Sequence, residues 1–135
     1  MKEPQPRRAP PVFFLDRNLG HRDVATALRQ AGAAVEEHHR HFAPDAADVE
    51  WLSVVGELGW AAITQDDRIR YRQAEKVAAL SSGLPLFIFT GRKMKATEIG
   101  TALVAALPAM TRFLSHAKRP FIARVTRSGQ VVRIV

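Results

Sequence analysis

Short apolar runs alternate with segments of helical periodicity between residues 12 and 114. Residues 12–15 and 85–90 are apolar at nearly every position, which is typical of strands buried on both faces of a parallel sheet. Four segments in all are predicted as strands: residues 12–15, 33–42, 60–64 and 85–90. Four are predicted as helices: residues 20–31, 48–58, 69–80 and 97–107, with Pro108 opening a further helical turn through residue 114. Because strand and helix alternate four times, the pattern predicts an α/β fold with a mostly parallel sheet of about four strands flanked by helices.

The two ends of the chain depart from this alternation. Residues 121–125 and 131–135, around Ser128-Gly129, predict a C-terminal β-hairpin that begins at about residue 120. Residues 1–11 are rich in proline and lack apolar periodicity, so we expect a disordered lead-in. No internal repeat or linker divides the remainder, and we expect residues 12–135 to form a single domain.

Composition narrows the class of protein. The chain has 135 residues and no cysteine, which excludes disulfide scaffolds, Cys-ligated zinc fingers, iron–sulfur sites and Cys nucleophiles. No apolar run approaches the roughly 18 residues of a membrane-spanning helix, and the polar N-terminus does not resemble a secretory signal. We therefore expect a soluble cytoplasmic protein with no membrane contact.

The charge of the chain changes sign along its length. Residues 1–67 carry seven Lys and Arg against eleven Asp and Glu, whereas residues 68–135 carry thirteen against two. Fifteen of the basic residues are arginine, whose planar fork suits bidentate phosphate contacts. Such a division is typical of a carboxylate site beside a nucleic-acid surface, or of a solvated surface produced by a coding bias toward Ala and Arg. Composition alone leaves both interpretations open.

Carboxylates follow the predicted strands at what should be one edge of the sheet. Asp16 ends the first strand and Asp66 with Asp67 ends the third, while Asp48 and Glu50 open the helix after the second. Ligands of open α/β sheets lie beyond the carboxyl ends of the strands. Carboxylates gathered there repel one another, and a hard divalent cation such as Mg²⁺ relieves that repulsion. The pattern predicts a metal site that activates water for attack on a phosphodiester.

Structural roles compete for some of these carboxylates. Asp16 is equally well explained as a cap of the first helix or as an acceptor for loop amides. Asp45 is better explained as an N-cap with Asp48 as its capping-box partner, and Asp67 as a cap of the third helix. At about 100° per residue, Asp48 lies nearer the buried face of its helix than Glu50 does. We therefore predict Asp16, Asp48 and Asp66 as catalytic metal ligands, with Glu50 and Asp67 as secondary candidates.

Three segments, FFLDRNLG, PDAADVEW and GWAAITQDDRIR, resemble the PIN-like ribonucleases, specifically the short VapC-type toxins of bacterial toxin–antitoxin pairs. The resemblance spans roughly residues 12–115 and rests on three motifs: a strand-ending Asp followed by Asn18, a D-x-E-W segment, and a strand ending I-T-x-D. It implies a three-layer sandwich and a Mg²⁺- or Mn²⁺-dependent endoribonuclease held inactive by a cognate antitoxin. Many members place a fourth acid two or three residues after the third, where this chain has Arg68 and Ile69. The resemblance therefore implies a one-metal site.

Basic residues follow the third and fourth strands, where a polyanionic substrate needs them. We predict that RNA is contacted by the cations that follow these two strands and by one aromatic residue among the arginines. These residues are Arg68, Arg70, Arg72, Tyr71, Arg92, Lys93 and Lys95. Tyr71 is equally well explained as a base-stacking residue and as ordinary helix surface or core packing.

Three histidines, His38, His39 and His41, fall within the predicted second strand. On a strand, only His39 and His41 share a face, together with Glu37. A solvated strand edge explains them better than a metal site does.

Other families fit the acidic pattern less well. A haloacid-dehalogenase-type phosphatase needs a second Asp where this chain has Asn18, and a response-regulator receiver has the opposite order of paired and single acids. No G-x-G-x-x-G or Walker loop is present, so we expect no nucleotide cofactor. The alternative to a nuclease is a degenerate PIN-like module that binds RNA or a protein partner without cleavage. The family further implies an antitoxin with an acidic segment, and a homodimer.

Overall fold

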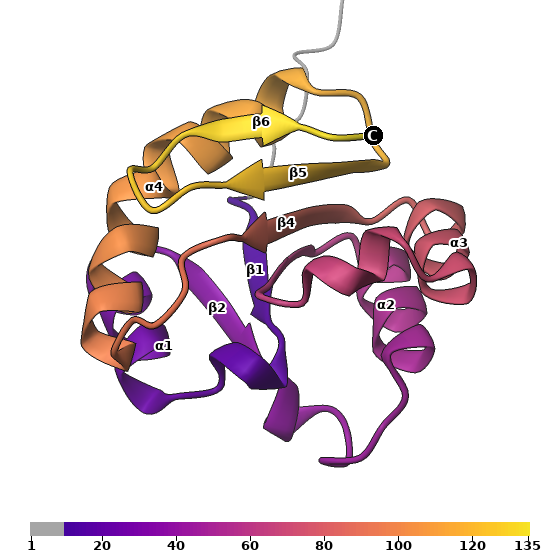
Figure 1. Cartoon of the computed structure of the whole chain (residues 1–135), viewed down its shortest axis with the longest axis horizontal. Coiled ribbons are helices and arrows are strands. Elements are labelled where there is room, and N and C mark those ends of the chain that lie inside the picture. Colours follow the sequence, from indigo (N-terminus) through magenta and orange to yellow (C-terminus); the bar gives the residue numbers. More distant parts are fainter. Residues whose placement is uncertain (1–9) are drawn as a thin grey trace, which may run out of the picture.

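The computed structural model describes residues 10–135, which contain a six-stranded sheet with helices on both faces (Figure 1). The strand order is β2-β1-β3-β4-β5-β6. The first five strands along the chain are parallel and β6 is antiparallel to β5. The strands are β1 Val12–Leu15, β2 Ala34–Glu37, β3 Ala61–Thr64, β4 Pro85–Phe89, β5 Phe121–Val125 and β6 Val131–Arg133.

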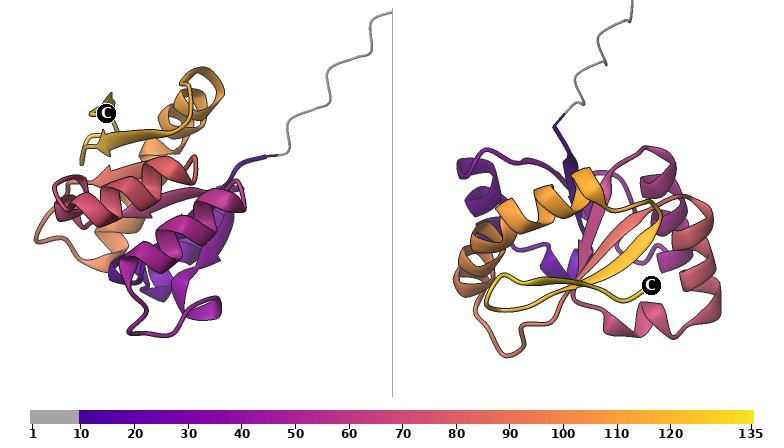
Figure 2. Two further views of the ribbon diagram at one scale, coloured as in Figure 1. Left: turned by 90° about the vertical axis from the view of Figure 1, so that its right-hand side faces the viewer. Right: turned by 90° about the horizontal axis from the view of Figure 1, so that it is seen from above.

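The helices form the two outer layers of a three-layer sandwich (Figure 2). Four α-helices are described: α1 Arg22–Gln30, α2 Asp48–Glu57, α3 Gln73–Ser81 and α4 Ala96–His116. Helices α1 and α4 cover one face of the sheet, and α2 and α3 cover the other. This architecture confirms the predicted α/β sandwich with a mostly parallel sheet.

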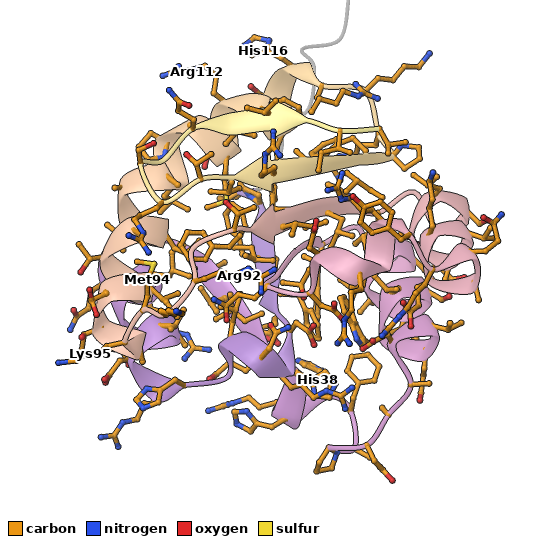
Figure 3. All side chains as sticks on the ribbon, in the orientation of Figure 1. His38, Arg92, Met94, Lys95, Arg112 and His116 are labelled. Atoms are coloured by element: carbon orange, nitrogen blue, oxygen red, sulfur yellow. The ribbon has the colours of Figure 1, made fainter. Side chains whose placement is uncertain are left out.

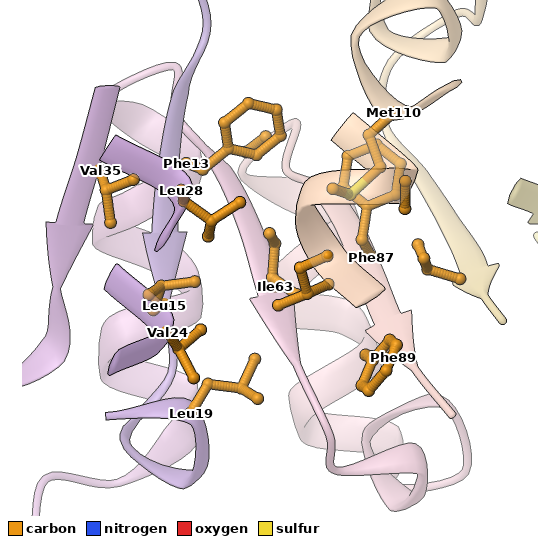
Figure 4. Packing of buried hydrophobic residues seen from close by; sticks show 14 of the residues in the cluster. Phe13, Leu15, Leu19, Val24, Leu28, Val35, Ile63, Phe87, Phe89 and Met110 are labelled. Atoms are coloured by element: carbon orange, nitrogen blue, oxygen red, sulfur yellow. The ribbon is translucent and has the colours of Figure 1, made fainter. Parts of the chain in front are cut away.

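The core is divided by the sheet because successive strand residues point to opposite faces. Phe13 and Leu15 pack with Val24 and Leu28 of α1 and with Met110 of α4 (Figure 4). The intervening residue, Phe14, packs against α2 and α3 on the other face. Because β1 is buried on both faces, its end has a fixed position, and the residue that follows it is fixed as well.

The predicted C-terminal hairpin is confirmed, and it extends the sheet. Strand β5 pairs in parallel with β4, from Pro85↔Phe121 to Phe89↔Val125. Four of the five β5 residues are buried, so apolar side chains on both faces of the strand account for its place inside the sheet.

Two predicted elements differ from the structure. The strand expected over residues 33–42 ends at Glu37, and a 3-10 turn, His38–Arg40, follows it. This prediction was wrong because the buried His38 packs beside Phe14, off the line of the strand. Residues 97–114 form part of a single helix, and Pro108 lies inside α4. A proline removes one backbone hydrogen bond, and the buried face of α4 continues past it to Met110 and Leu114.

The ends of other segments also differ. Residue Ala47 is the N-cap of α2, so the predicted cap Asp45 was wrong. A 3-10 turn, Asp67–Arg70, precedes α3, which begins at Gln73 rather than near residue 69. The expected disordered lead-in falls mainly on residues 1–9, outside the described residues.

Candidate active site

A cavity of about 560 Å³ lies at the carboxyl edge of the sheet, beyond β1 and β3. These two strands are neighbours, and α2 begins beside them, so the residues after each strand and at the start of that helix meet there. The lining is carboxylate, arginine and amide: Asp16, Arg17, Asn18, Asp48, Gln65, Asp66, Asp67, Arg68, Arg72 and Arg92. The structure thus brings the three acids that the sequence singled out to one cavity.

Asp16 is the most deeply buried of these acids, with 3% of its surface exposed. Its carboxylate accepts hydrogen bonds from Thr64 Oγ1 at 2.8 Å and from the Arg17 backbone N–H at 2.7 Å. Burial raises the pKa of Asp16 more than these hydrogen bonds lower it, and the negative charge of Asp48 raises it further. A cation in the cavity would therefore stabilise the charged form of Asp16.

Thr64 links the ends of β1 and β3. Its hydroxyl donates to Asp16 and accepts from Asn18 Nδ2 at 3.3 Å and from the Asp66 backbone N–H at 3.0 Å. Asn18 Oδ1 in turn accepts from the Gln65 backbone N–H at 3.2 Å. This network holds Asp16 and the backbone of Asp66 in a fixed relation.

Asp48, the first residue of α2, is fixed from within the same helix. Trp51 Nε1 donates to Asp48 Oδ1 at 2.9 Å, and Arg17 Nη2 lies 3.5 Å from the same oxygen. Trp51 is completely buried and stacks on Phe14 with ring centroids 5.4 Å apart. By contrast, Glu50 is exposed and does not line the cavity.

Asp66 is paired with arginines from its own loop. Its Oδ1 accepts from the Arg68 backbone N–H at 3.1 Å and from Arg68 Nε at 3.0 Å, and Arg72 Nη1 lies 3.9 Å from Oδ2. Asp66 therefore caps the 3-10 turn, whereas Arg72 is the N-cap of α3, so the expectation that Asp67 caps the third helix was wrong. Asp67 instead pairs with Arg70 Nε at 2.8 Å.

The donor chemistry of this cavity suits a hard divalent cation, because four carboxylates line it, those of Asp16, Asp48, Asp66 and Asp67. Within residues 10–135, however, no three Asp, Glu or His side chains lie close enough together to hold a metal ion. Arginines neutralise two of the acids, since Arg17 pairs with Asp48, and Arg68 with Asp66. Metal binding would require these arginines to turn away and the carboxylates to close.

Only some of the predicted RNA-contact residues line the cavity. Arg68, Arg72 and Arg92 do, and Figure 3 shows Arg92 near the middle of the molecule, with Lys95 apart from it at the start of α4. The others lie outside the lining: Arg70 pairs with Asp67 and covers the exposed Tyr71 ring at 4.4 Å, while Lys93 and Lys95 are exposed.

The comparisons with known proteins agree with this geometry. A family model described as "PIN like domain" matches residues 11–91, which include β1 to β4 and all three acids. The chain belongs to the PIN-like domain family. It is also 29% identical over 127 residues, 91% of each chain, to a Mycobacterium tuberculosis protein named "Putative ribonuclease VapC45". No solved structure matches the chain.

Several residues of this PIN-like cavity escaped the sequence-based prediction. Arg17 and Gln65 line it, and each is adjacent in sequence to a predicted element end. Glu75 lies behind it on α3, where Oε1 is 3.5 Å from Arg72 Nη1 and Oε2 is buried without a hydrogen-bond partner among the described residues. Burial raises the pKa of Glu75. In the sequence, only the spacing of Arg72 and Glu75, three positions apart, indicates this ion pair.

The histidines do not form a common face on the PIN-like domain. His38 is 2% exposed and packs against Phe14 and Phe42. His41 Nε2 lies 2.8 Å from Glu36, while Glu37 pairs with Arg29 across the edge of the sheet. The prediction that His39, His41 and Glu37 share one face of a strand was therefore wrong, because the strand ends at Glu37, before the two histidines.

Over the described range, no helix is both long and apolar enough to cross a membrane.

Proposed function

We propose that the protein is a divalent-metal-dependent endoribonuclease that hydrolyses RNA phosphodiester bonds, and that it is the toxin of a VapBC-type pair in the cytoplasm. One observation carries the proposal: Asp16, Asp48 and Asp66 line the same cavity as Arg68, Arg72 and Arg92. Membership of the PIN-like family supports it, and so does the name of the mycobacterial relative.

In this proposal Asp16, Asp48 and Asp66 hold Mg²⁺ or Mn²⁺ together with waters. The bound cation supplies an activated water and neutralises the charge that develops on the scissile phosphate. The residues around the acids set their directions: Thr64 orients the Asp16 carboxylate, and Trp51 orients the Asp48 carboxylate.

The arginines of the cavity have two roles, one in the absence of a bound metal and one in its presence. Without a metal, Arg17 and Arg68 balance the charge of Asp48 and Asp66. With a cation held by the acids, Arg68 and Arg72 would be free to bind RNA phosphates beside Arg92, and the arginine fork is well suited to that contact. We therefore expect metal and RNA to bind with positive coupling, each raising the affinity for the other.

A non-cleaving PIN-like module is the second candidate function. Two observations favour it: Arg68 and Ile69 stand where many members place a fourth acid, and the three carboxylates are not at metal-binding spacing. Such a module would bind RNA or a protein through the same arginines.

Cleavage of RNA distinguishes the two functions. The purified protein is incubated with single-stranded RNA in Mg²⁺, in Mn²⁺ and in EDTA, and both cleavage and binding are measured. The proposal predicts cleavage with either metal and none in EDTA. Binding without cleavage under all three conditions would contradict the nuclease and support the module.

The proposed protein partners follow from the basic charge of the protein and from its exposed apolar side chains. A cationic toxin requires a neutralising partner, and we propose an antitoxin with an acidic segment. Exposed apolar side chains on α2 and α3, Val49, Val54 and Val77 among them, offer a surface for homodimerisation. The gene upstream of this one tests the first point: an open reading frame for a small DNA-binding protein is the expected finding.

A further inference from the structure

A second cavity, of about 400 Å³, lies beside the candidate active site and is rich in arginine. Its charged lining consists of Arg22 and Arg29 from α1, Glu37 at the end of β2, and Arg40 with His39 from the turn that follows. None of these residues lines the first cavity. This arginine cavity lies in the acidic half of the sequence, so charge counting along the chain could not reveal it.

The arginine cavity adjoins the candidate active site along the same edge of the sheet. Strand β2 pairs with β1 so that Glu37 is the partner of Leu15, the residue before Asp16. Neighbouring strands lie about 4.8 Å apart. The turn Arg17–Leu19 separates the two cavities, since Arg17 lines the first and Gly20 the second. A chain of phosphates that follows this edge would pass from one cavity to the next.

The charge in the arginine cavity is only partly balanced. Arg29 is fixed by hydrogen bonds to the Val35 carbonyl at 2.9 Å and to Glu37 at 3.3 Å. Arg40 also reaches Glu37, at 3.8 Å, but its side chain is 66% exposed. Arg22 forms no ion pair with any residue of the described range. One carboxylate thus faces three guanidinium groups, and two of these project into solvent.

We infer that the arginine cavity binds a phosphate of the same RNA strand whose scissile phosphate lies in the first cavity. The inference rests on the proposed function. An anionic ligand is indicated by the excess positive charge, and a phosphate by the guanidinium forks, which donate paired hydrogen bonds to its oxygens. An RNA strand is favoured over an acidic protein because the two cavities lie side by side on one edge, as regularly spaced phosphates require. Arg22 and Arg40 bind the phosphate, and Arg29 is a positioning residue that holds Glu37.

The test is the salt dependence of RNA binding by the full-length protein. Wild type and the double variant Arg22→Ala/Arg40→Ala are titrated with a single-stranded RNA at several salt concentrations, with EDTA present to keep the RNA intact. Both residues are exposed, so the variant should fold, and its thermal unfolding is compared with that of wild type. Loss of this phosphate contact makes the slope of log affinity against log salt shallower by about 0.7, the contribution of one neutralised phosphate on a single strand.

The matched control is Arg112→Ala/Arg124→Ala, which removes the same charge elsewhere. Arg112 lies on the far side of the molecule from His38 in Figure 3, and Arg124 is exposed on β5. The control should keep the wild-type slope. If the salt slope of Arg22→Ala/Arg40→Ala equals that of the control, the inference is wrong, and an acidic protein becomes the candidate ligand of the arginine cavity. If wild type itself does not bind RNA, this inference is wrong, and RNA cleavage in Mg²⁺ decides separately whether the proposed function holds.

Discussion

Trp51 Nε1 donates a 2.9 Å hydrogen bond to Asp48 Oδ1, from a ring that is completely buried. The bond joins the first turn of α2 to the aromatic core, where Trp51 stacks on Phe14. The rotamer of a candidate metal ligand is therefore set by a residue that cannot move without disturbing the core. Pre-organisation of this kind strengthens a site because the carboxylate loses little freedom when it binds.

Replacing Trp51 by Phe should weaken metal binding with little loss of the fold. Phenylalanine keeps an aromatic ring against Phe14 and removes only the donor and the second ring. A hydrogen bond to a charged group is worth about 1.5–3 kcal/mol, so we expect the Mn²⁺ affinity to fall by about tenfold or more. Calorimetric titration of Mn²⁺ measures this, and thermal unfolding reports the stability of the variant.

The matched control for this change is Trp60→Phe. Trp60 also stacks near Phe14, with ring centroids 6.5 Å apart, but does not line the cavity. Its replacement should leave the Mn²⁺ affinity as in wild type. Equal losses in Trp51→Phe and Trp60→Phe would mean that the aromatic packing matters rather than the hydrogen bond to Asp48.

Removing the arginines that pair with Asp66 should change the affinities for metal and for RNA in opposite directions. In Arg68→Ala/Arg72→Ala a cation no longer competes with the two solvent-exposed ion pairs of Asp66, which are weak interactions. We therefore expect Mn²⁺ to bind a few-fold more tightly, while RNA binds more weakly and with a shallower salt dependence. Calorimetry and fluorescence anisotropy measure the two affinities.

Arg112→Ala/Arg124→Ala serves as the control for the pair, because it also removes two arginines and neither of them lines the cavity. This control should leave the Mn²⁺ affinity and the RNA affinity closer to those of wild type than Arg68→Ala/Arg72→Ala does. A decrease in Mn²⁺ affinity in Arg68→Ala/Arg72→Ala would show that the arginines organise Asp66 instead of competing for it.

Acid should destabilise the protein through His38. Burial, followed by the positive charge of Arg17, lowers the pKa of His38 below the ordinary histidine value of 6.5. Because the folded state then binds the proton less readily than the unfolded chain, stability is full above about pH 6.5 and decreases as the pH falls toward the lowered pKa. Urea unfolding at pH 7.5 and pH 5.5 measures the loss, and His38→Leu should reduce it.

The exposed neighbour His39 provides the comparison for this prediction. His39→Ala should keep the wild-type difference in unfolding free energy between the two pH values. If His38→Leu and His39→Ala show the same pH dependence as wild type, other groups cause the loss of stability.

The sequence predicts well what depends on local pattern. The apolar runs before Asp16 and Asp66 predict strands that are buried on both faces. Parallel pairing of these two strands then brings their carboxyl ends together. The helix that starts at Asp48 is equally visible from its apolar face. The α/β class and the three acids at one cavity could therefore be inferred before the structure.

What the sequence could not predict depends on tertiary contacts. The second strand ends at Glu37 because His38 packs against Phe14, which is 24 positions earlier in the chain. No periodicity within residues 33–42 shows this. The same holds for the ion pair of Arg17 with Asp48, since side chains so distant in sequence meet only through the fold.

The central claim is that Asp16 and Asp66 carry RNA hydrolysis, and the most direct measurement is the rate of RNA cleavage in Mg²⁺. Wild type is compared with Asp16→Asn, Asp66→Asn and the control Asp45→Asn, an exposed acid outside the cavity. We predict that wild type and Asp45→Asn cleave at similar rates, whereas each site variant is slower on the order of 100-fold. Equal cleavage by all four proteins would contradict the site.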